Sequence, residues 1–302
     1  MVDFYSSKLI QCEHIFVVTS PLLESVTHTI IEHYNTKEYD KTLFSINQFI
    51  SPEILANERK VGTFTRMIHY NLEHINLRNK NVNKELDASW GDDECWGYKS
   101  FEMYDELWDF LLENKDYYPE RLREKFKFMP LRYNTMSESN LLVKSDYKYD
   151  LAFLGFFGTV SRCNMMVRLS SLVKEHGVSV VTLMGFTKED IADVMSRTRY
   201  VLDYPHYSEL LNSQNAVRIF DNILMGNDVV CCMNTDLKMD YFDGLVQTVN
   251  LNGGNIVEDL YAALQKEPRA LNEDYRKLTY LDNDYEDWRA RLVEKYNANY
   301  NK

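Results

Sequence analysis

The sequence predicts an α/β fold made of two sheet-containing domains that face each other across a cleft. Three observations support this prediction. Short apolar strands alternate with helices in both halves of the chain, 302 residues are enough for two separate cores, and a polar stretch at residues 134–150 divides the two halves. We therefore expect an N-terminal domain at residues 1–140 and a C-terminal domain at residues 141–302.

The first half alternates less regularly than the second. Short apolar runs bounded by turn residues predict four strands there, at residues 14–20, 42–46, 66–75 and 125–134. Residues 21–34 start with proline and continue as a helix. Residues 101–114 fit either a strand or a helix, and the pattern leaves that choice open.

The second half is clearer. Its expected strands lie at residues 149–157, 178–185, 199–207, 228–233 and 245–249, and its expected helices lie at 161–177, 188–198, 215–226, 255–267 and 284–296. In the first of these helices Met165, Leu169 and Leu172 share the inward face, and Gly177 is the stop signal. Such alternation indicates a parallel sheet with helices on both faces, and in these sheets ligands bind beyond the carboxyl ends of the strands.

The helix at 215–226 has the features of a nucleotide site. Arg218 and Asp221 are three residues apart, so they share one face of its first turns. A cation at a helix start can face phosphate, and a carboxylate can accept two ribose hydroxyls. The preceding loop offers further hydrogen-bonding groups, at Ser213, Gln214 and Asn215. The alternative interpretation is a surface ion pair between Arg218 and Asp221.

Two residues just before this loop are further candidates. His206 and Tyr207 follow the strand expected at 199–207 and lie ahead of the nucleotide helix. We expect them to contact sugar or phosphate. Their alternative role is that of turn aromatics packed on the sheet.

Composition excludes several classes. The formal net charge of −12 argues against general binding of nucleic acid, which needs a cationic surface. The five cysteines show no metal-ligand spacing, and the acidic run at 92–94 is expected to be a solvated loop, so no metal site is predicted. No apolar run is long enough to span a membrane and the start lacks signal-peptide features, so a cytoplasmic protein is expected.

Three common enzyme motifs are absent from the sequence. A nicotinamide dehydrogenase would carry G-x-G-x-x-G after a first strand, a P-loop kinase would carry G-x-x-x-x-G-K-[ST], and a serine hydrolase would carry G-x-S-x-G. Another two-domain α/β class therefore fits better.

The stretch from Arg218 to Gly226 resembles the R-x-x-E-x-x-x-x-G helix start of nucleotide-sugar transferases, and the whole chain resembles a GT-B glycosyltransferase. That family has two Rossmann-like domains that face a cleft. The resemblance implies that Asp221 binds the donor ribose and that Arg218 lies beside the diphosphate. Asp221 stands where glutamate is commoner, and its reach is shorter.

Two other segments share this resemblance. In the family, the loop matching FLGFFGTVSR (153–162) approaches the donor diphosphate. Gly155 and Gly158 would allow close backbone approach, and Thr159, Ser161 and Arg162 would supply phosphate contacts. A plain strand-to-helix turn is the alternative. Residues 68–132 resemble the first-domain layout of bacterial and viral GT-B enzymes.

The first domain is expected to supply acid–base chemistry. An inverting transferase needs a carboxylate or histidine to take the acceptor proton, whereas a retaining one needs mainly electrostatic stabilisation of the leaving diphosphate. Glu73 is the candidate base and His69 the second candidate, because both follow or end a predicted strand. Local capping or pairing is the alternative role of Glu73.

The expected function is therefore transfer of a hexose or pentose from a nucleotide diphosphate sugar, most often UDP-linked, to a hydroxyl acceptor. The acceptor could be a glycan, a lipid-linked glycan, a small molecule or a modified base. The resemblance implies no cofactor beyond the donor. Two alternatives stay open: an enzyme that glycosylates modified bases of viral DNA, and a non-catalytic nucleotide-sugar-binding subunit.

Overall fold

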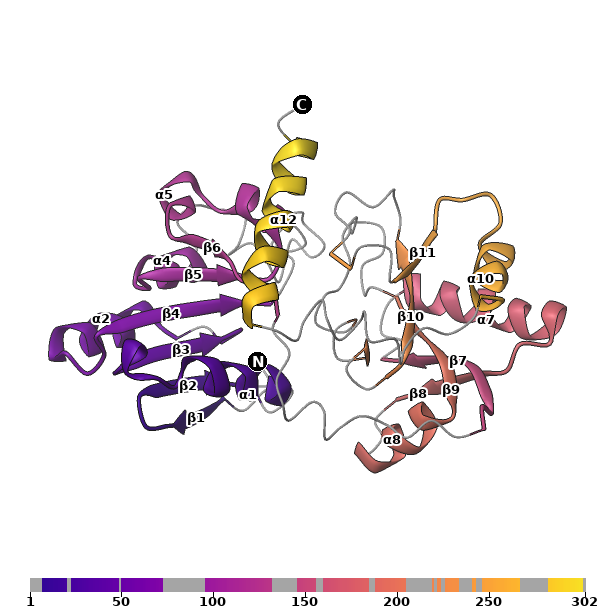
Figure 1. Ribbon diagram of the computed structural model, residues 1–302, viewed down its shortest axis with the longest axis horizontal. Coiled ribbons are helices and arrows are strands. Elements are labelled where there is room, and N and C mark those ends of the chain that lie inside the picture. The colour runs from indigo at the N-terminus through magenta and orange to yellow at the C-terminus, as the bar shows by residue number, and fades with distance from the viewer. Residues whose placement is uncertain are drawn as a thin grey trace. The chain divides into compact units, whose positions relative to one another are not determined.

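Most of the chain is described by a computed structural model (Figure 1). The described residues are 7–20, 23–48, 50–72, 96–131, 146–155, 160–184, 188–204, 219, 222–223, 226–233, 241–242, 246–266 and 282–300. The chain divides into two compact units, Met1–Met136 and Ser137–Lys302, called here the first unit and the second unit.

A six-stranded sheet of order β1-β2-β3-β4-β5-β6 forms the centre of the first unit (Figure 1). Its strands are β1 (Lys8–Gln11), β2 (Ile15–Thr19), β3 (Thr42–Ile46), β4 (Arg66–Asn71), β5 (Glu106–Asp109) and β6 (Phe126–Phe128). All neighbours from β2 to β6 run parallel. β3 is buried along its whole length, and its two polar residues, Thr42 and Ser45, are buried with the apolar ones.

The first strand and the second helix are among the elements of the first unit that the sequence did not predict. β1 pairs antiparallel with β2, so the sheet is mixed rather than wholly parallel. Helix α2 (Pro52–Val61) buries only Leu55, which leaves almost no apolar periodicity to detect. Its ends carry ordinary signals nonetheless: the Ser51 side chain accepts a hydrogen bond from the Ile54 amide, and Gly62 ends the helix at a φ of 74°.

The segment that fitted either a strand or a helix contains both. Helix α4 (Trp96–Glu102) ends inside it, β5 follows, and the 3-10 helix η3 (Leu112–Tyr117) comes next. Helix α1 (Glu24–Tyr34), the 3-10 helix η2 (Lys37–Tyr39) and helix α5 (Glu120–Arg123) complete the unit. One core cluster joins helices α2, α4 and α5 to the sheet through Leu43, Leu55, Met67, Phe101, Tyr104, Leu107, Tyr118 and Leu122.

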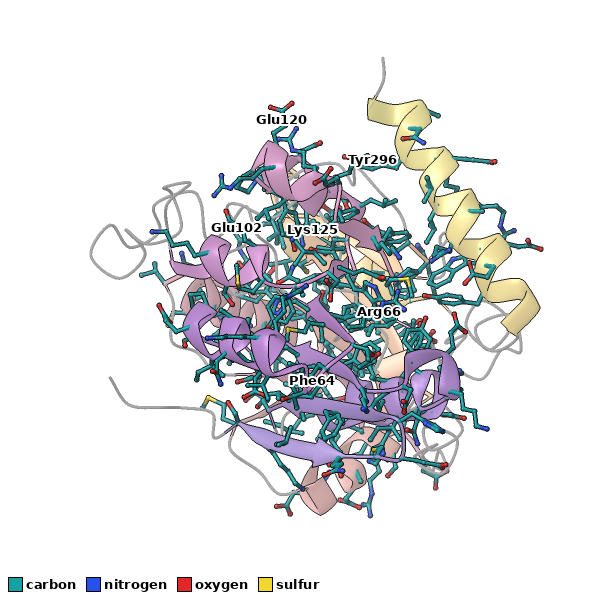
Figure 2. The ribbon with its side chains drawn as sticks, turned by 90° about the vertical axis from the view of Figure 1, so that its left-hand side faces the viewer. Phe64, Arg66, Glu102, Glu120, Lys125 and Tyr296 are labelled. Atoms are coloured by element: carbon teal, nitrogen blue, oxygen red, sulfur yellow. The ribbon has the colours of Figure 1, made fainter. Side chains whose placement is uncertain are left out.

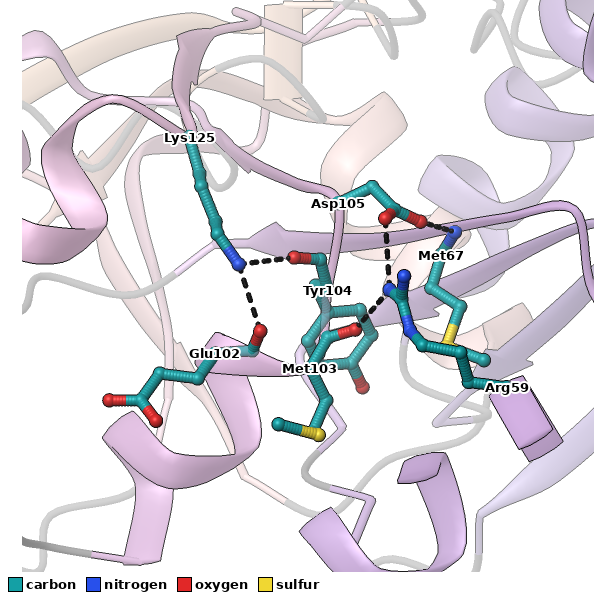
Figure 3. A network of polar contacts seen from close by, with 7 residues as sticks. All are labelled: Arg59, Met67, Glu102, Met103, Tyr104, Asp105 and Lys125. Atoms are coloured by element: carbon teal, nitrogen blue, oxygen red, sulfur yellow. Dashed lines mark hydrogen bonds and ion pairs between the residues drawn. The ribbon is translucent and has the colours of Figure 1, made fainter. Parts of the chain in front are cut away.

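Two cations hold the loop after α4 in place (Figure 3). The Lys125 ammonium donates to the carbonyl oxygens of Glu102 and Tyr104, both at 2.8 Å. The Arg59 guanidinium donates to the Met103 carbonyl at 2.7 Å and to the Asp105 carboxylate at 2.9 Å. Lys125 directly precedes β6, so this network lies at the amino end of the first sheet. Arg66, the first residue of β4, lies at the same end (Figure 2).

The second unit is built on a five-stranded sheet of order β11-β10-β9-β7-β8. Its strands are β7 (Tyr149–Leu154), β8 (Val180–Leu183), β9 (Thr198–Asp203), β10 (Asp228–Met233) and β11 (Gln247–Asn250), and all their pairings are parallel. Every residue of β10 is buried, as predicted for the 228–233 run.

Helices cover both faces of this sheet. Helix α7 (Val160–His176) packs with Met165, Leu169 and Leu172 inward, and Gly177 follows it at a φ of 67°, as predicted. Helix α10 (Ile256–Leu264) belongs to the same cluster. Helix α8 (Lys188–Ser196) packs Met195 against Ala152 and Val201 in a separate cluster. The α/β class and the parallel sheet with helices on both faces are confirmed.

The last described helix, α12 (Asp282–Tyr300), confirms the helix predicted at 284–296. Tyr285, Trp288, Leu292 and Tyr296 recur on one face of it and are buried. Within the described part of the chain, no helix combines the length and the apolar character needed to cross a membrane.

Candidate functional site

The charged residue that best marks a site in the second unit is Arg162, in the first turn of α7. Its side chain is only 5 % exposed. The guanidinium donates to the Tyr204 carbonyl at 3.3 Å, and its Cζ lies 5.6 Å from the centroid of the Phe153 ring. Phe153 belongs to β7 and Tyr204 directly follows β9, so Arg162 lies at the carboxyl ends of two adjacent strands.

The space for this guanidinium depends on Gly155, the residue after β7. Gly155 has a φ of 156°. A Cβ atom at this position would lie 3.4 Å from Arg162 Nη1 and 3.2 Å from the Phe153 ring. Glycine therefore serves both the backbone conformation and the close approach of the cation.

A hydroxyl pair fixes the same corner. The side-chain oxygens of Ser161 and Tyr204 lie 2.8 Å apart, and the Tyr204 hydroxyl also lies 3.3 Å from the Ser161 carbonyl. The start of α7 is thereby tied to the end of β9. The first amides of a helix have no partners within the helix and carry its positive dipole end, so a buried arginine in the first turn adds to a field that favours anions.

The carboxyl end of β9 also carries a buried acid. Asp203 is cross-strand partner to Cys231 of β10, and the Cys231 sulfur lies 3.5 Å from the Asp203 carboxylate. Burial raises the pKa of the neighbouring Cys232 thiol, and the charge of Asp203 raises it further. Cys232 therefore stays a neutral thiol packed in the core of the sheet, as expected from its apolar run.

Most of the predicted donor-site residues lie outside the described residues. These are Gly158, Thr159, His206, Tyr207, Ser213, Gln214, Asn215, Arg218 and Asp221. The neighbouring Ile219 and Asn222 are described as buried and helical, and Gly226 ends this stretch with a φ of 81°. The roles of Arg218 and Asp221 stay predictions.

Of the two acid–base candidates, His69 is among the described residues and Glu73 is not. His69 lies within β4 with no exposed surface, and its ring packs against Phe101 and Tyr104 at centroid distances of 4.7 and 5.3 Å. A proton-transfer role for His69 stays a prediction, and it would require these rings to move.

Sequence reasoning missed a polar cluster in the first unit. Asp109 ends β5, is fully buried, and binds Asn71 at the end of β4. The two residues are far apart in the sequence and meet only through strand pairing. The available signal was a pair of polar residues, each ending an apolar run that leads into a turn.

Comparison of the sequence with protein families and with proteins of described function gives no match. Solved structures do match. AviGT4, a glycosyltransferase involved in avilamycin A biosynthesis, is similar with a TM-score of 0.50 and 9 % identity, over 91 % of this chain and 88 % of that one. A UDP-forming trehalose-phosphate synthase from Burkholderia xenovorans gives a TM-score of 0.44 at 7 % identity, over 92 % and 78 % of the two chains.

A UDP-GlcNAc 2-epimerase from Methanocaldococcus jannaschii gives a TM-score of 0.43 at 9 % identity, over 82 % of this chain and 75 % of that one. At such low sequence identity, structural similarity indicates the fold and not the activity. Among these structures, the likeness to AviGT4 is strong enough to show a shared fold. This agrees with the α/β fold expected from the resemblance to GT-B glycosyltransferases, with a largely parallel sheet in each of the two units.

Proposed function

We propose that this protein is a glycosyltransferase that moves a sugar from a nucleotide diphosphate donor, UDP-linked, to a hydroxyl acceptor. The observation that carries the proposal is the buried Arg162 at the carboxyl ends of β7 and β9, beside the start of α7. A buried arginine there is placed to meet a diphosphate, because charge-assisted contacts gain strength where water is excluded.

In this reaction the bond between the anomeric carbon and the diphosphate oxygen breaks, and the acceptor oxygen bonds to that carbon. The leaving diphosphate gains negative charge, which Arg162 and the first amides of α7 would stabilise. Arg218 would add a second cation and Asp221 would hold the ribose. His206, Tyr207, Gly158, Thr159 and the loop Ser213, Gln214 and Asn215 complete the proposed donor site.

The acceptor proton is assigned to the first unit, with Glu73 as base and His69 as the second candidate. Hexose or pentose transfer without a metal or a further cofactor follows from the same proposal. The acceptor is a neutral or small hydroxyl compound, because the net charge of −12 opposes binding of a polyanion.

A thermal-shift panel of UDP, GDP, TDP and ADP and their sugars tests the donor site. A nucleotide at about 100 times its dissociation constant adds about 2.7 kcal/mol to stability. Replacing Arg162 by alanine should weaken binding roughly ten- to a hundredfold, since a hydrogen bond to a charged group is worth about 1.5–3 kcal/mol. Lys174→Ala is the matched control: this exposed lysine lies on the same helix near its other end. No shift with any nucleotide, or equal loss in both variants, would refute the proposal.

A further inference from the structure

The carboxylate of Asp109 is the most completely bonded acid described in the first unit. Its Oδ1 accepts from the Leu111 amide at 2.9 Å and from the Asn114 side chain at 2.8 Å. Its Oδ2 accepts from the Asn71 side chain at 2.8 Å and from the Tyr118 hydroxyl at 3.0 Å. Each oxygen therefore binds two donors, and one acid connects β4 with the segment from Leu111 to Tyr118.

A second contact holds the end of β4. Asn47 follows β3 in the left-handed conformation, with a φ of 54°. The side-chain oxygen of Asn47 accepts from the Leu72 amide at 2.8 Å, and the backbone amide of Asn47 donates to the Tyr70 carbonyl at 3.0 Å. The chain that leaves β4 is thus held by hydrogen bonds to Asn47 and by the Asn71–Asp109 pair.

Stability alone is a weak reason to bury such an acid. Apolar replacement of a buried polar group with its partner is often neutral or stabilising, whereas removing one partner is costly. The other acid of the same strand offers a contrast. Glu106 starts β5, keeps 12 % of its side chain exposed, and is bonded to Trp108 and to the cations Arg66 and Lys127.

The two acids also lie at opposite ends of the sheet. Asp109 ends β5 and Glu106 begins it, and Asn71 is the cross-strand partner of Asp109. Ligands of parallel sheets bind beyond the carboxyl ends of the strands. The polar cluster around Asp109 therefore lies at the carboxyl end of the sheet, where a substrate would bind. The ion-paired Glu106 lies at the amino end, where no substrate is expected.

We propose that Asp109 is a positioning residue, which acts through Asn71 to fix the point where the chain leaves β4 and so aligns the acceptor side of the transfer reaction. The proposal rests on the proposed function, because that function assigns proton transfer to Glu73, the residue after Leu72. It adds a role that does not involve the donor: Asp109 should govern the rate of transfer and leave donor binding unchanged.

The test uses Asp109→Asn at pH 8, with the nucleotide sugar that most stabilises the wild type and water as acceptor. The new amide turns a donor towards one pair of its four neighbours. Facing Asn71 and Tyr118, it makes the Asn71 side chain reverse or lose its bond; facing Leu111 and Asn114, it leaves the Leu111 amide without an acceptor. Tyr118→Phe is a milder variant that removes one donor of four. Glu106→Gln is the matched control, because it neutralises a bonded acid on the same strand at the opposite end.

We expect Asp109→Asn to lower kcat for donor hydrolysis at least tenfold, with the donor KM within twofold of wild type. Tyr118→Phe should lower kcat by a smaller factor, and Glu106→Gln should leave both constants within twofold. The double variant Asn71→Asp/Asp109→Asn restores an acid–amide pair. It should recover thermal stability and part of kcat, because the restored pair again fixes the end of β4.

Three outcomes overturn the proposal. An unchanged kcat in folded Asp109→Asn removes the positioning role. Recovery of stability without any recovery of kcat in the double variant shows that the pair only holds the fold together. Absence of any bound or hydrolysed nucleotide sugar in the wild type refutes the proposed function itself, and the positioning role with it. The first two results leave the donor site intact, so the failures are distinguishable.

Discussion

Gly155 and Arg162 approach each other at the carboxyl end of β7, where a Cβ on the glycine would lie 3.4 Å from the arginine Nη1 and 3.2 Å from the Phe153 ring beneath the guanidinium. The close approach makes the position of the guanidinium depend on a residue that has no side chain. It links the conformation of the strand end to the charge that the donor site requires.

Gly155→Ala should therefore weaken binding of a nucleoside diphosphate about tenfold, which is about 1.4 kcal/mol. Gly177→Ala is the matched control, because its φ of 67° is also positive but no atom lies within 4 Å of the added Cβ. Both variants should lose about 1–3 kcal/mol of stability to backbone strain. Isothermal titration with UDP separates them, and equal affinities in the two variants would contradict the link.

Arg218→Ala and Asp221→Ala should leave the fold intact and weaken donor binding roughly ten- to a hundredfold, because each removes a charge-assisted contact. Arg197→Ala is the control: Arg197 pairs with Asp193 at 3.0 Å in an exposed i,i+4 ion pair. Such pairs contribute about 0–1 kcal/mol. If Arg218→Ala behaves like Arg197→Ala in both stability and UDP affinity, the surface ion-pair interpretation is correct.

The stability of the first unit should fall as pH rises from about 4 to about 7 through Asp109. Burial raises the pKa of Asp109 to about 7, although the Leu111 amide and the Asn71, Asn114 and Tyr118 side chains act in the opposite direction. In that pH window the folded state holds a proton that the unfolded state has released, so the free energy of unfolding decreases with pH. In urea unfolding at pH 5, 6, 7 and 8, the free energy of unfolding of Asp109→Asn should rise with pH relative to that of the wild type.

The control for this titration is again Glu106→Gln. Burial acts to raise the pKa of Glu106, but hydrogen bonds from Trp108, Arg66 and Lys127 outweigh it and lower the pKa overall. Its stabilising contribution is present above the unfolded pKa and is lost as pH falls through the lower folded value. The difference between Glu106→Gln and wild type should therefore be flat from pH 5 to 8. A pH-independent difference for Asp109→Asn would contradict the assignment.

Lys125→Met should cost about 1–3 kcal/mol of stability, because the carbonyls of Glu102 and Tyr104 would lose the donor seen in Figure 3. Arg121→Met is the comparison: Arg121 binds the Glu102 carboxylate at 2.7 Å, with both side chains about 40 % exposed. A surface pair of this kind contributes about 0–1 kcal/mol. Chemical denaturation gives both values, and a larger loss in Arg121→Met would disprove the ranking.

The second unit was predictable because its central strands β9 and β10 are buried on both faces and its helices on one. Continuous apolar runs such as β10 and the inward spacing of Met165, Leu169 and Leu172 record those environments directly in the sequence. β1 has no such record, since its residues are mostly exposed at an edge. Helix α2 could have been found from Ser51, Pro52 and Gly62, its start and stop residues.

The site was harder to predict than the fold. Arg162 could be proposed because it follows a strand, a glycine and a helix start in close succession. The Asn71–Asp109 pair could not, because its two members are 38 residues apart and periodicity carries no information on which strands become neighbours. Strand order is a property of tertiary packing, and polar pairs across strands become visible only once that order is known.

The antiparallel start of the first sheet bears on the order of assembly. β1 and β2 are joined by a turn in which the Cys12 amide donates to the Ile15 carbonyl at 2.9 Å, and this is the antiparallel pair among the described strand pairings. Parallel neighbours must wait for a crossover connection, whereas a hairpin closes locally. During refolding, pulsed hydrogen exchange should show amides of β1 and β2 protected before those of β5. Because β1 and β2 precede β3 in the chain, the growing polypeptide can pair β2 with β1 before β3 is synthesised, which leaves the other edge of β2 open for β3.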